Sequence, residues 1–306
     1  MDRRKFIGNS LAGVLVGAVG SFPMDAFVDE PNLTKITILH TNDVHSRIDP
    51  FPMDGGRNEG MGGVAKRATI VNQIRRREKN VLLFDSGDIF QGTPYFNLFG
   101  GELEMKLMSK LRYDAGTMGN HDFDAGIDGF AKQMAHANFP FVVSNYNFDN
   151  TLLNNRVDKH KIFEIDEVKI GVIGLGIELD GLVPPALYLD TVYEDPISKA
   201  QEEAILLKEE KDCDFVVCLS HLGFKYKSEK QPSDILLAQN TTHIDMILGG
   251  HTHTFLKEPV TEKNLEGKSV IINQVGFAGI LLGRIDLVFE KNREHRCVTC
   301  KNEWVK

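Results

Sequence analysis

Five clusters of polar residues stand directly after short apolar segments of this 306-residue chain. They are His40-Thr-Asn-Asp-Val-His45, Ser86-Gly-Asp88, Gly119-Asn-His-Asp-Phe-Asp124, Ser220-His221 and Gly249-Gly-His-Thr-His253. Each apolar segment is typical of a buried β-strand, and segments with helical spacing lie between them. Because the carboxyl ends of the strands of an open α/β sheet meet at one edge, where ligands bind, we expect the five clusters to form one site.

The alternation of strands and helices predicts an α/β fold with a mixed sheet. Apolar residues make up 42% of the chain and charged residues 25%, which excludes disordered, collagen-like and coiled-coil chains. Strands are predicted at residues 35–40, 81–85, 114–118, 215–219, 246–248, 270–272 and 280–289, a hairpin at 162–173, and helices at 64–79, 102–111, 127–137 and 196–211.

The residue types in the clusters predict a metal centre. Imidazole, carboxylate and amide groups suit divalent Mn, Fe, Co or Zn, and the lack of cysteine in the clusters disfavours a closed structural zinc site. The candidate ligands outnumber what one ion needs, so two ions that share a ligand fit better. Two ions would attract a phosphorylated substrate despite the net charge of −8, whereas that charge argues against binding of nucleic-acid polymers. The candidate ligands are Asp43, His45, Asp88, Asn120, His221, His251 and His253.

These motifs resemble those of the calcineurin-like metallophosphoesterases. The resemblance rests on Asp43-x-His45, Gly87-Asp88, Gly119-Asn-His-Asp122, Ser220-His221 and Gly250-His-Thr-His253. Longer strings, such as Asp85-Ser-Gly-Asp-Ile-Phe-Gln-Gly92, narrow it to the N-terminal catalytic domain of the bacterial 5′-nucleotidase family, over residues 34–290. The resemblance implies the fold of that family, a four-layer αββα sandwich with mixed sheets of the metallo-dependent phosphatase type.

The resemblance also implies a role for each site residue. One metal ion would be held by Asp43, His45 and His253, and the other by Asn120, His221 and His251, with Asp88 bridging both. His121 would act at the leaving group as transition-state stabiliser or general acid, oriented by Asp124. The implied activity is the hydrolysis of phosphate monoesters, 5′-nucleotides first among them, by metal-bound hydroxide.

Several of these residues also have purely structural interpretations. Asp43 and Asp88 are also typical of helix caps or turns, and His221 of a buried strand end. His40 either supports a ligand or is simply packed, and Asn145 either lines the pocket or forms a turn. The remaining histidines lie outside the motifs and are predicted to be surface residues: His136, His160, His243 and His295.

The two ends of the chain are predicted to lie outside the catalytic domain. Residues 1–26 resemble a twin-arginine export signal, because Arg3 and Arg4 precede an apolar segment that is too short to span a membrane. Such a signal predicts a periplasmic or otherwise exported bacterial protein without a transmembrane segment in its mature chain. Residues 291–306 are predicted to form a polar tail, in which Cys297 and Cys300 are incidental or disulfide-bonded rather than half of a zinc site.

The resemblance ends close to the end of the chain, so we expect the second domain of two-domain 5′-nucleotidases, which recognises the base, to be missing. This leaves open a separate protein that supplies a C-terminal domain, a broad phosphatase, or a substrate that is not a nucleotide. The same centre would also serve a cyclic-nucleotide phosphodiesterase, a UDP-sugar hydrolase or a thiosulfohydrolase-like enzyme. A metal-binding subunit without catalysis is a further alternative, which the presence of His121 and Asp124 disfavours.

Overall fold

Two β-sheets form the frame of the fold in a computed structural model that describes residues 33–228, 230–290 and 295–306. In spatial order, the first sheet consists of β13 (His295–Trp304), β12 (Leu281–Glu290), β1 (Leu33–Thr41), β2 (Val81–Asp85) and β3 (Ala115–Gly116). The second sheet consists of β10 (Val260–Lys263), β11 (Ser269–Asn273), β9 (Met246–Gly249), β8 (Phe215–Ser220), β6 (Val168–Leu175) and β5 (His160–Ile165). A separate two-stranded ribbon pairs β4 (Tyr146–Asn147) with β7 (Val192–Tyr193).

Helices cover the outer faces of the sheets and border the loops at the strand ends. The α-helices are α2 (Val64–Arg77), α3 (Pro94–Phe99), α4 (Glu102–Leu111), α5 (Gly126–Gln133), α6 (Pro185–Tyr188), α7 (Pro196–Ile205) and α8 (Asp234–Gln239). Three short turns of other helical types are η2 (Asn120–Phe123), η3 (Met134–His136) and the π-helical η4 (Leu206–Glu210).

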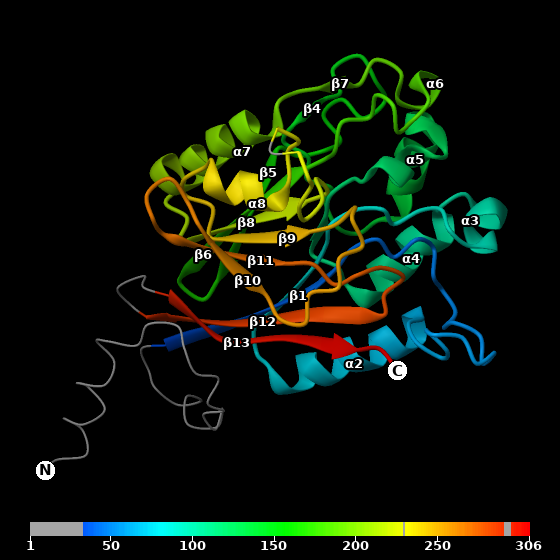
Figure 1. The fold of residues 1–306 in the computed structure, drawn as a ribbon, viewed down its shortest axis with the longest axis horizontal. Helices are drawn as coiled ribbons and strands as arrows, with labels where there is room; N and C mark the ends of the chain where they lie inside the picture. Colours follow the sequence, from blue (N-terminus) through cyan, green and yellow to red (C-terminus); the bar gives the residue numbers. More distant parts are fainter. Residues whose placement is uncertain (1–32, 229, 291–294) are drawn as a thin grey trace, which may run out of the picture. The chain divides into compact units, whose positions relative to one another are not determined.

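The order of the layers follows from the direction in which the apolar side chains point. Ile38 of β1 and Val217 of β8 are fully buried in a core between the two sheets. Leu39, the next residue of β1, points to the opposite face and packs in a second core with α2, α4 and α5. Cys218 packs in a third core with α7 and α8. Figure 1 shows the resulting stack of α7 and α8, second sheet, first sheet and α2, which confirms the predicted four-layer αββα sandwich.

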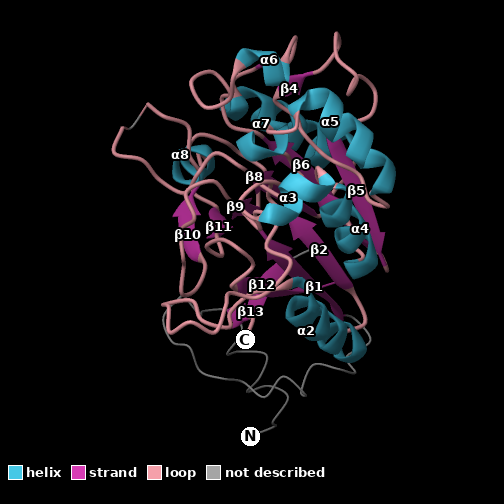
Figure 2. Ribbon diagram, turned by 90° about the vertical axis from the view of Figure 1, so that its right-hand side faces the viewer, coloured by secondary structure: helices cyan, strands magenta, loops and turns pink. Residues whose placement is uncertain are grey.

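Parallel pairing brings the polar clusters to one edge of the sandwich. Thr41 at the end of β1 lies beside Asp85 at the end of β2, which lies beside Gly116 of β3. In the second sheet, Ser220 at the end of β8 lies beside Gly249 at the end of β9. The loops that follow these strands lie in front of them in the view of Figure 2, so the two sheets present their motif loops on the same side.

Most of the predicted elements are present, and several differ in their bounds. The strand predicted at 114–118 is reduced to Ala115–Gly116, and the helix predicted at 127–137 is an α-helix only to Gln133, followed by η3. The predicted hairpin pairs Ile165 with Val168 and therefore turns at Asp166 and Glu167. The helix predicted at 196–211 is an α-helix only to Ile205, and its last turn is the π-helical η4.

The segment that was predicted as a polar tail contains β13, which corrects the prediction. This strand pairs antiparallel with β12, from Trp304 beside Leu281 to His295 beside Phe289. Edge strands carry many polar side chains, so the sequence of β13 does not show the apolar alternation that identifies β12.

The cysteines and the chain ends complete the fold. Cys213 and Cys218 are free and buried, as expected of small core residues. Cys300 is disulfide-bonded, while the side chain of Cys297 and the predicted signal at residues 1–26 lie outside the described residues. Within the described part of the chain, no helix has the length and apolar character needed to cross a membrane.

Candidate metal centre

The loops at the edge of the sandwich bring the candidate ligands into two adjacent groups. In the first ligand group (Asp43, His45 and His253), the ligand atoms lie within 4.8 Å of one another. His253 Nε2 lies 3.3 Å from Asp43 Oδ1 and 3.0 Å from His45 Nε2. This group therefore offers one carboxylate and two imidazole nitrogens that converge on one point.

The second ligand group (Asp88, Asn120, His221 and His251) lies beside the first. His221 Nε2 is 3.1 Å from Asp88 Oδ2, and His251 Nδ1 is 2.9 Å from Asn120 Oδ1. Asp88 Oδ2 also lies 3.8 Å from His45 Nε2 of the first group. Asp88 thus faces both groups, in the place that a shared ligand requires.

Strained backbone holds several of these residues. Asp43, His45, Asp88, His251 and His253 all have φ angles between 50° and 71°, which place them in the left-handed region. For residues other than glycine this conformation is unfavourable, and it persists at functional sites where the surrounding structure enforces it. The loops are therefore built to aim these side chains at a common point.

A glycine makes room for Asp88. A Cβ atom added to Gly119 would lie only 2.2 Å from Asp88 Oδ1 and 2.6 Å from the Asp88 backbone nitrogen. The backbone NH of His121 donates a hydrogen bond of 2.8 Å to the same carboxylate oxygen. The close approach of these two loops thus requires glycine at position 119.

Asp122 ties the loops together, a role that the sequence did not predict although the residue lies within a motif. Its fully buried carboxylate accepts hydrogen bonds from the backbone NH groups of Asp88, Ile89, Phe90 and Gly119. Burial and the neighbouring charge of Asp88 raise the pKa of Asp122 to about 7. The role of Asp122 could have been inferred from its place in the Gly119-Asn-His-Asp122 motif, two residues after the candidate ligand Asn120.

Asn42 is a second residue whose role the sequence did not predict. Its side-chain amide donates to the carbonyl oxygen of Gly276 at 2.7 Å and accepts from the Val275 NH at 3.0 Å. The Ala278 NH also donates to the Asp43 carbonyl oxygen at 2.7 Å. These bonds fix the loop at residues 275–278 against the first ligand group, where the ring of Phe277 stacks on that of His253 with centroids 5.1 Å apart.

The charges of the centre fit divalent cations. Burial lowers the pKa of His221, but the carboxylates of Asp88 and Asp43 outweigh this effect and raise it to about 10. Among the described residues, the buried His221 Nε2 has no hydrogen bond of good geometry. A buried imidazole nitrogen that faces carboxylates without a proper hydrogen bond is suited to a metal ion, which takes the place of the proton.

His121 and Asp124 lie at the open side of the centre. His121 Nδ1 and Asp124 Oδ2 are 2.8 Å apart, and the His121 side chain is 38% exposed. This hydrogen bond raises the pKa of His121 against the opposing effect of burial. The other ring nitrogen, Nε2, takes no part in this bond.

The other polar residues considered from the sequence have structural surroundings. His40 is fully buried, burial lowers its pKa to about 3, and it receives a hydrogen bond from Asn273 Nδ2. It is packed and belongs to neither ligand group. The Asn145 amide is buried and bonds twice to the Gly176 backbone, so it joins two loops. Four further histidines, among the described residues, also lie outside the two groups: His136, His160, His243 and His295.

Comparisons with known proteins identify the family of this domain. The model of the family described as Calcineurin-like phosphoesterase matches residues 36–255. The venom 5′-nucleotidase of Crotalus adamanteus is 34% identical over 277 residues, which are 84% of this chain and 45% of that protein. The chain thus spans about half the length of the curated relatives it matches.

Two solved structures are similar in fold. The 5′-nucleotidase precursor from Thermus thermophilus has a TM-score of 0.77 at 30% identity, over 88% of this chain and 54% of that one. A calcineurin-like phosphoesterase from Bacillus subtilis has a TM-score of 0.68 at 25% identity, over 89% of this chain and 91% of that one. The region of similarity contains both ligand groups.

Proposed function

We propose a reaction from the premise that this chain belongs to the calcineurin-like phosphoesterase family: it hydrolyses phosphate monoesters at a dinuclear metal centre, with 5′-nucleotides as the substrate class. The observation that carries the proposal is the convergence of two groups of nitrogen and oxygen ligands on either side of Asp88. The substrate class follows from the relatives, which are named 5′-nucleotidases.

The two ligand groups divide the metal ions between them. Asp43, His45 and His253 would hold one ion, Asn120, His221 and His251 would hold the other, and Asp88 would be shared by the two. Two divalent ions held there would supply Lewis acidity to the phosphoryl group and would lower the pKa of a water molecule that serves as the nucleophile. The mixture of imidazole, carboxylate and amide suits Mn, Fe, Co or Zn.

His121 works on the leaving group. Asp124 accepts the Nδ1 proton and thereby fixes the tautomer and the plane of the ring. Protonated His121 carries a second proton on Nε2, which it donates to the oxygen of the departing alcohol. Its partial exposure leaves room for a substrate to approach from solvent.

The test is hydrolysis by the purified chain, stripped of metal and then reloaded with Mn²⁺ or Zn²⁺. The panel contains a nucleoside monophosphate, a UDP-sugar, a cyclic nucleotide, a thiosulfate ester and a generic aryl phosphate. We expect metal-restored turnover that is fastest on the nucleoside monophosphate and is lost in His121→Ala. His136→Ala is the matched control, because it removes a histidine outside the centre.

Each other outcome has a defined meaning. Faster turnover of a diester or thiosulfate ester would overturn the substrate class and leave the centre in place. Two bound metals without turnover of any ester would contradict the proposal and support a subunit that depends on a partner. Strong discrimination between bases by this chain alone would remove the need for a separate protein that recognises the base.

Export through the twin-arginine route is a separate part of the proposal, supported by Arg3 and Arg4 before an apolar segment. That route carries folded proteins, so the metal ions would be bound before export. Replacing both arginines with lysine should stop the appearance of the protein in the periplasm. Export that is unchanged in this variant would refute the twin-arginine assignment.

A further inference from the structure

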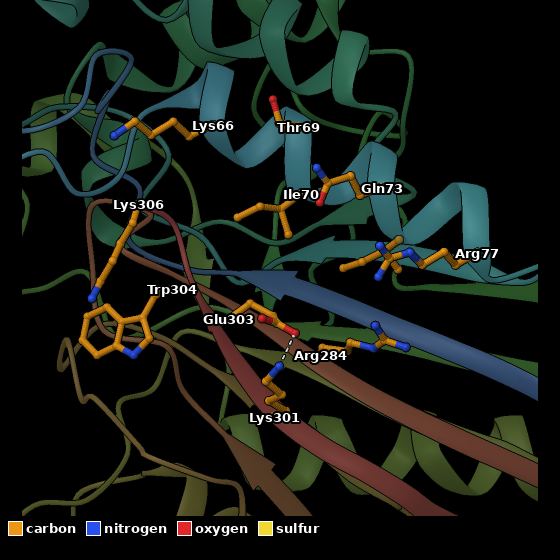
Figure 3. A pocket seen from close by; sticks show the side chains of 11 residues that line it. Lys66, Thr69, Ile70, Gln73, Arg77, Arg284, Lys301, Glu303, Trp304 and Lys306 are labelled. Carbon is orange, nitrogen blue, oxygen red and sulfur yellow. Dashed lines mark ion pairs between the residues drawn. The ribbon is translucent and has the colours of Figure 1, made fainter. Parts of the chain in front are cut away.

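A groove lies between helix α2 and strands β12 and β13, apart from the metal centre. Its cavity of about 550 Å³ contains none of the ligands or the catalytic pair. Figure 3 shows the side chains of α2 along one wall and those of β12 and β13 along the other. We define the basic groove by the charged and aromatic residues that line it: Lys66, Arg77, Arg284, Lys301, Trp304 and Lys306.

The basic groove carries positive charge that the protein does not neutralise. Arg284 is paired with Glu78 and Asp286 at 2.6 and 2.9 Å, and Lys301 is paired with Glu303 at 2.8 Å. The other three cations, Lys66, Arg77 and Lys306, have no carboxylate partner among the described residues, and Lys66 Nζ donates to the Gly60 carbonyl oxygen at 2.6 Å. Three cations whose charge no carboxylate balances lie along one groove, on a chain with a net charge of −8, and they indicate a site for an anion.

An aromatic ring lies at one end of the basic groove. The side chain of Trp304 is 52% exposed, although the next residue, Val305, is fully buried. The Lys306 ammonium lies 5.0 Å from the centre of the Trp304 ring. An exposed indole beside a cation suits a ligand that combines a planar ring with negative charge.

The dimensions favour a small molecule. The wall from Lys66 to Arg77 follows the axis of α2 for about 16 Å, at the helical rise per residue. A cavity of about 550 Å³ lies within the range of small-molecule sites, whereas a stable protein partner needs a much wider surface.

We propose that the basic groove binds a nucleoside diphosphate at a second site outside the metal centre. The base lies against Trp304, and the phosphates extend along α2 toward Arg77. An arginine at that end is suited to phosphate, because its planar guanidinium donates two parallel hydrogen bonds. This proposal does not depend on the reaction proposed for the metal centre.

The experiment uses the fluorescence of Trp304, which is the only tryptophan of the chain and therefore reports on the basic groove directly. The probe is the methylene-bridged analogue of ADP, which cannot be cleaved between its phosphates. We expect a saturable change in emission, with a half-saturation concentration raised at least about tenfold in Arg77→Glu. Arg76→Glu is the matched control, because Arg76 is exposed on the same turn of α2 but does not line the groove.

The remaining outcomes separate the ligand classes. Pyrophosphate and adenosine should each require at least about tenfold higher concentration than the analogue, since each offers half of the contacts. Pyrophosphate that binds as well as the analogue would overturn the role of the base. A polyglutamate peptide that changes the emission at lower concentration would replace the nucleotide with an acidic protein segment. An emission that stays constant to millimolar analogue, or that responds equally in the two arginine variants, would overturn the site.

Discussion

Each ligand group of the metal centre contains a histidine that differs from its counterpart in burial and in how its ring is held: His221 in the second group and His253 in the first. In the second group, His221 is fully buried and its Nδ1 donates to the Ser86 carbonyl oxygen at 2.7 Å. In the first group, His253 is 40% exposed, and no hydrogen bond holds its Nδ1 among the described residues. The flat face of its ring rests on Phe277 instead.

This difference has a consequence for how each group binds its ion. A ligand that is fixed by a hydrogen bond from its other nitrogen is already aimed when the metal arrives, whereas a freer ligand loses side-chain freedom on binding. We therefore expect the second group to bind its ion more tightly. The first group, whose His253 is 40% exposed, is expected to exchange its ion more easily.

The largest effect is expected from His221→Ala. It removes a buried ligand that lies 3.1 Å from Asp88 Oδ2 and 4.0 Å from Asp43 Oδ1. Turnover should fall by about a thousandfold or more, and metal analysis should find at most one ion per chain. His253→Ala should also retain one ion, but excess metal should restore part of its turnover. If both variants lose turnover equally and excess metal restores neither, the expected difference in metal affinity between the two groups is wrong.

The second-largest effect is expected from Gly119→Ala, which fills the space beside Asp88, the ligand that faces both groups. In Gly119→Ala, the new methyl would press on the Asp88 carboxylate, and a displacement of that ligand by about 1 Å lowers turnover roughly a hundredfold. Both ions should bind more weakly, because Asp88 faces both groups. Gly116→Ala is the control, since its nearest neighbour would be 3.4 Å away. Normal metal binding in Gly119→Ala would show that Asp88 can shift without loss.

Much of this comparison could be predicted from the sequence, because the ligands follow strands with a clear apolar signal. Val216 to Leu219 and Ile247 to Leu248 are buried on both faces, so their uninterrupted apolar runs mark β8 and β9, which end at Ser220 and Gly249. Parallel register then carries both loops to the same edge without further information. The motif residues therefore meet at one edge of the sandwich, as their positions after the strands predict.

The features that distinguish the two groups could not be predicted in this way. Phe277 reaches His253 from a loop that Asn42, more than two hundred residues earlier, helps to fix. The stabilising bonds of Asp122 come from backbone NH groups, which leave no mark on residue types. β13 was missed for a related reason, since its pairing with β12 decides its structure more than its own pattern does.

A smaller effect is expected from Asp124→Asn, because Asp124 is a partner of His121 and not a member of either ligand group. Without the carboxylate, the His121 ring loses the acceptor that fixes its tautomer, so kcat should fall by about 10- to 100-fold. The metal content and KM should stay close to those of the unaltered protein, because Asp124 belongs to neither ligand group. Loss of an ion together with kcat would indicate that Asp124 supports the metal site rather than the proton transfer.

The smallest effect tests the stacked ring itself. Phe277→Leu keeps an apolar side chain but removes the flat face under His253, and aromatic pairs contribute about 0.5–1.5 kcal/mol beyond the area they bury. The affinity for the more weakly bound ion should therefore fall about two- to tenfold in calorimetric titration, while the tightly bound ion is unaffected. Phe277→Tyr retains the stack and should restore the affinity.

Phe51→Leu is the control, because Phe51 contacts the edge of Phe277 and makes no ring contact with His253 among the described residues. Equal weakening by the two leucine variants would assign the effect to packing of the loop, and the stacked ring would then have no separate part in holding the first group.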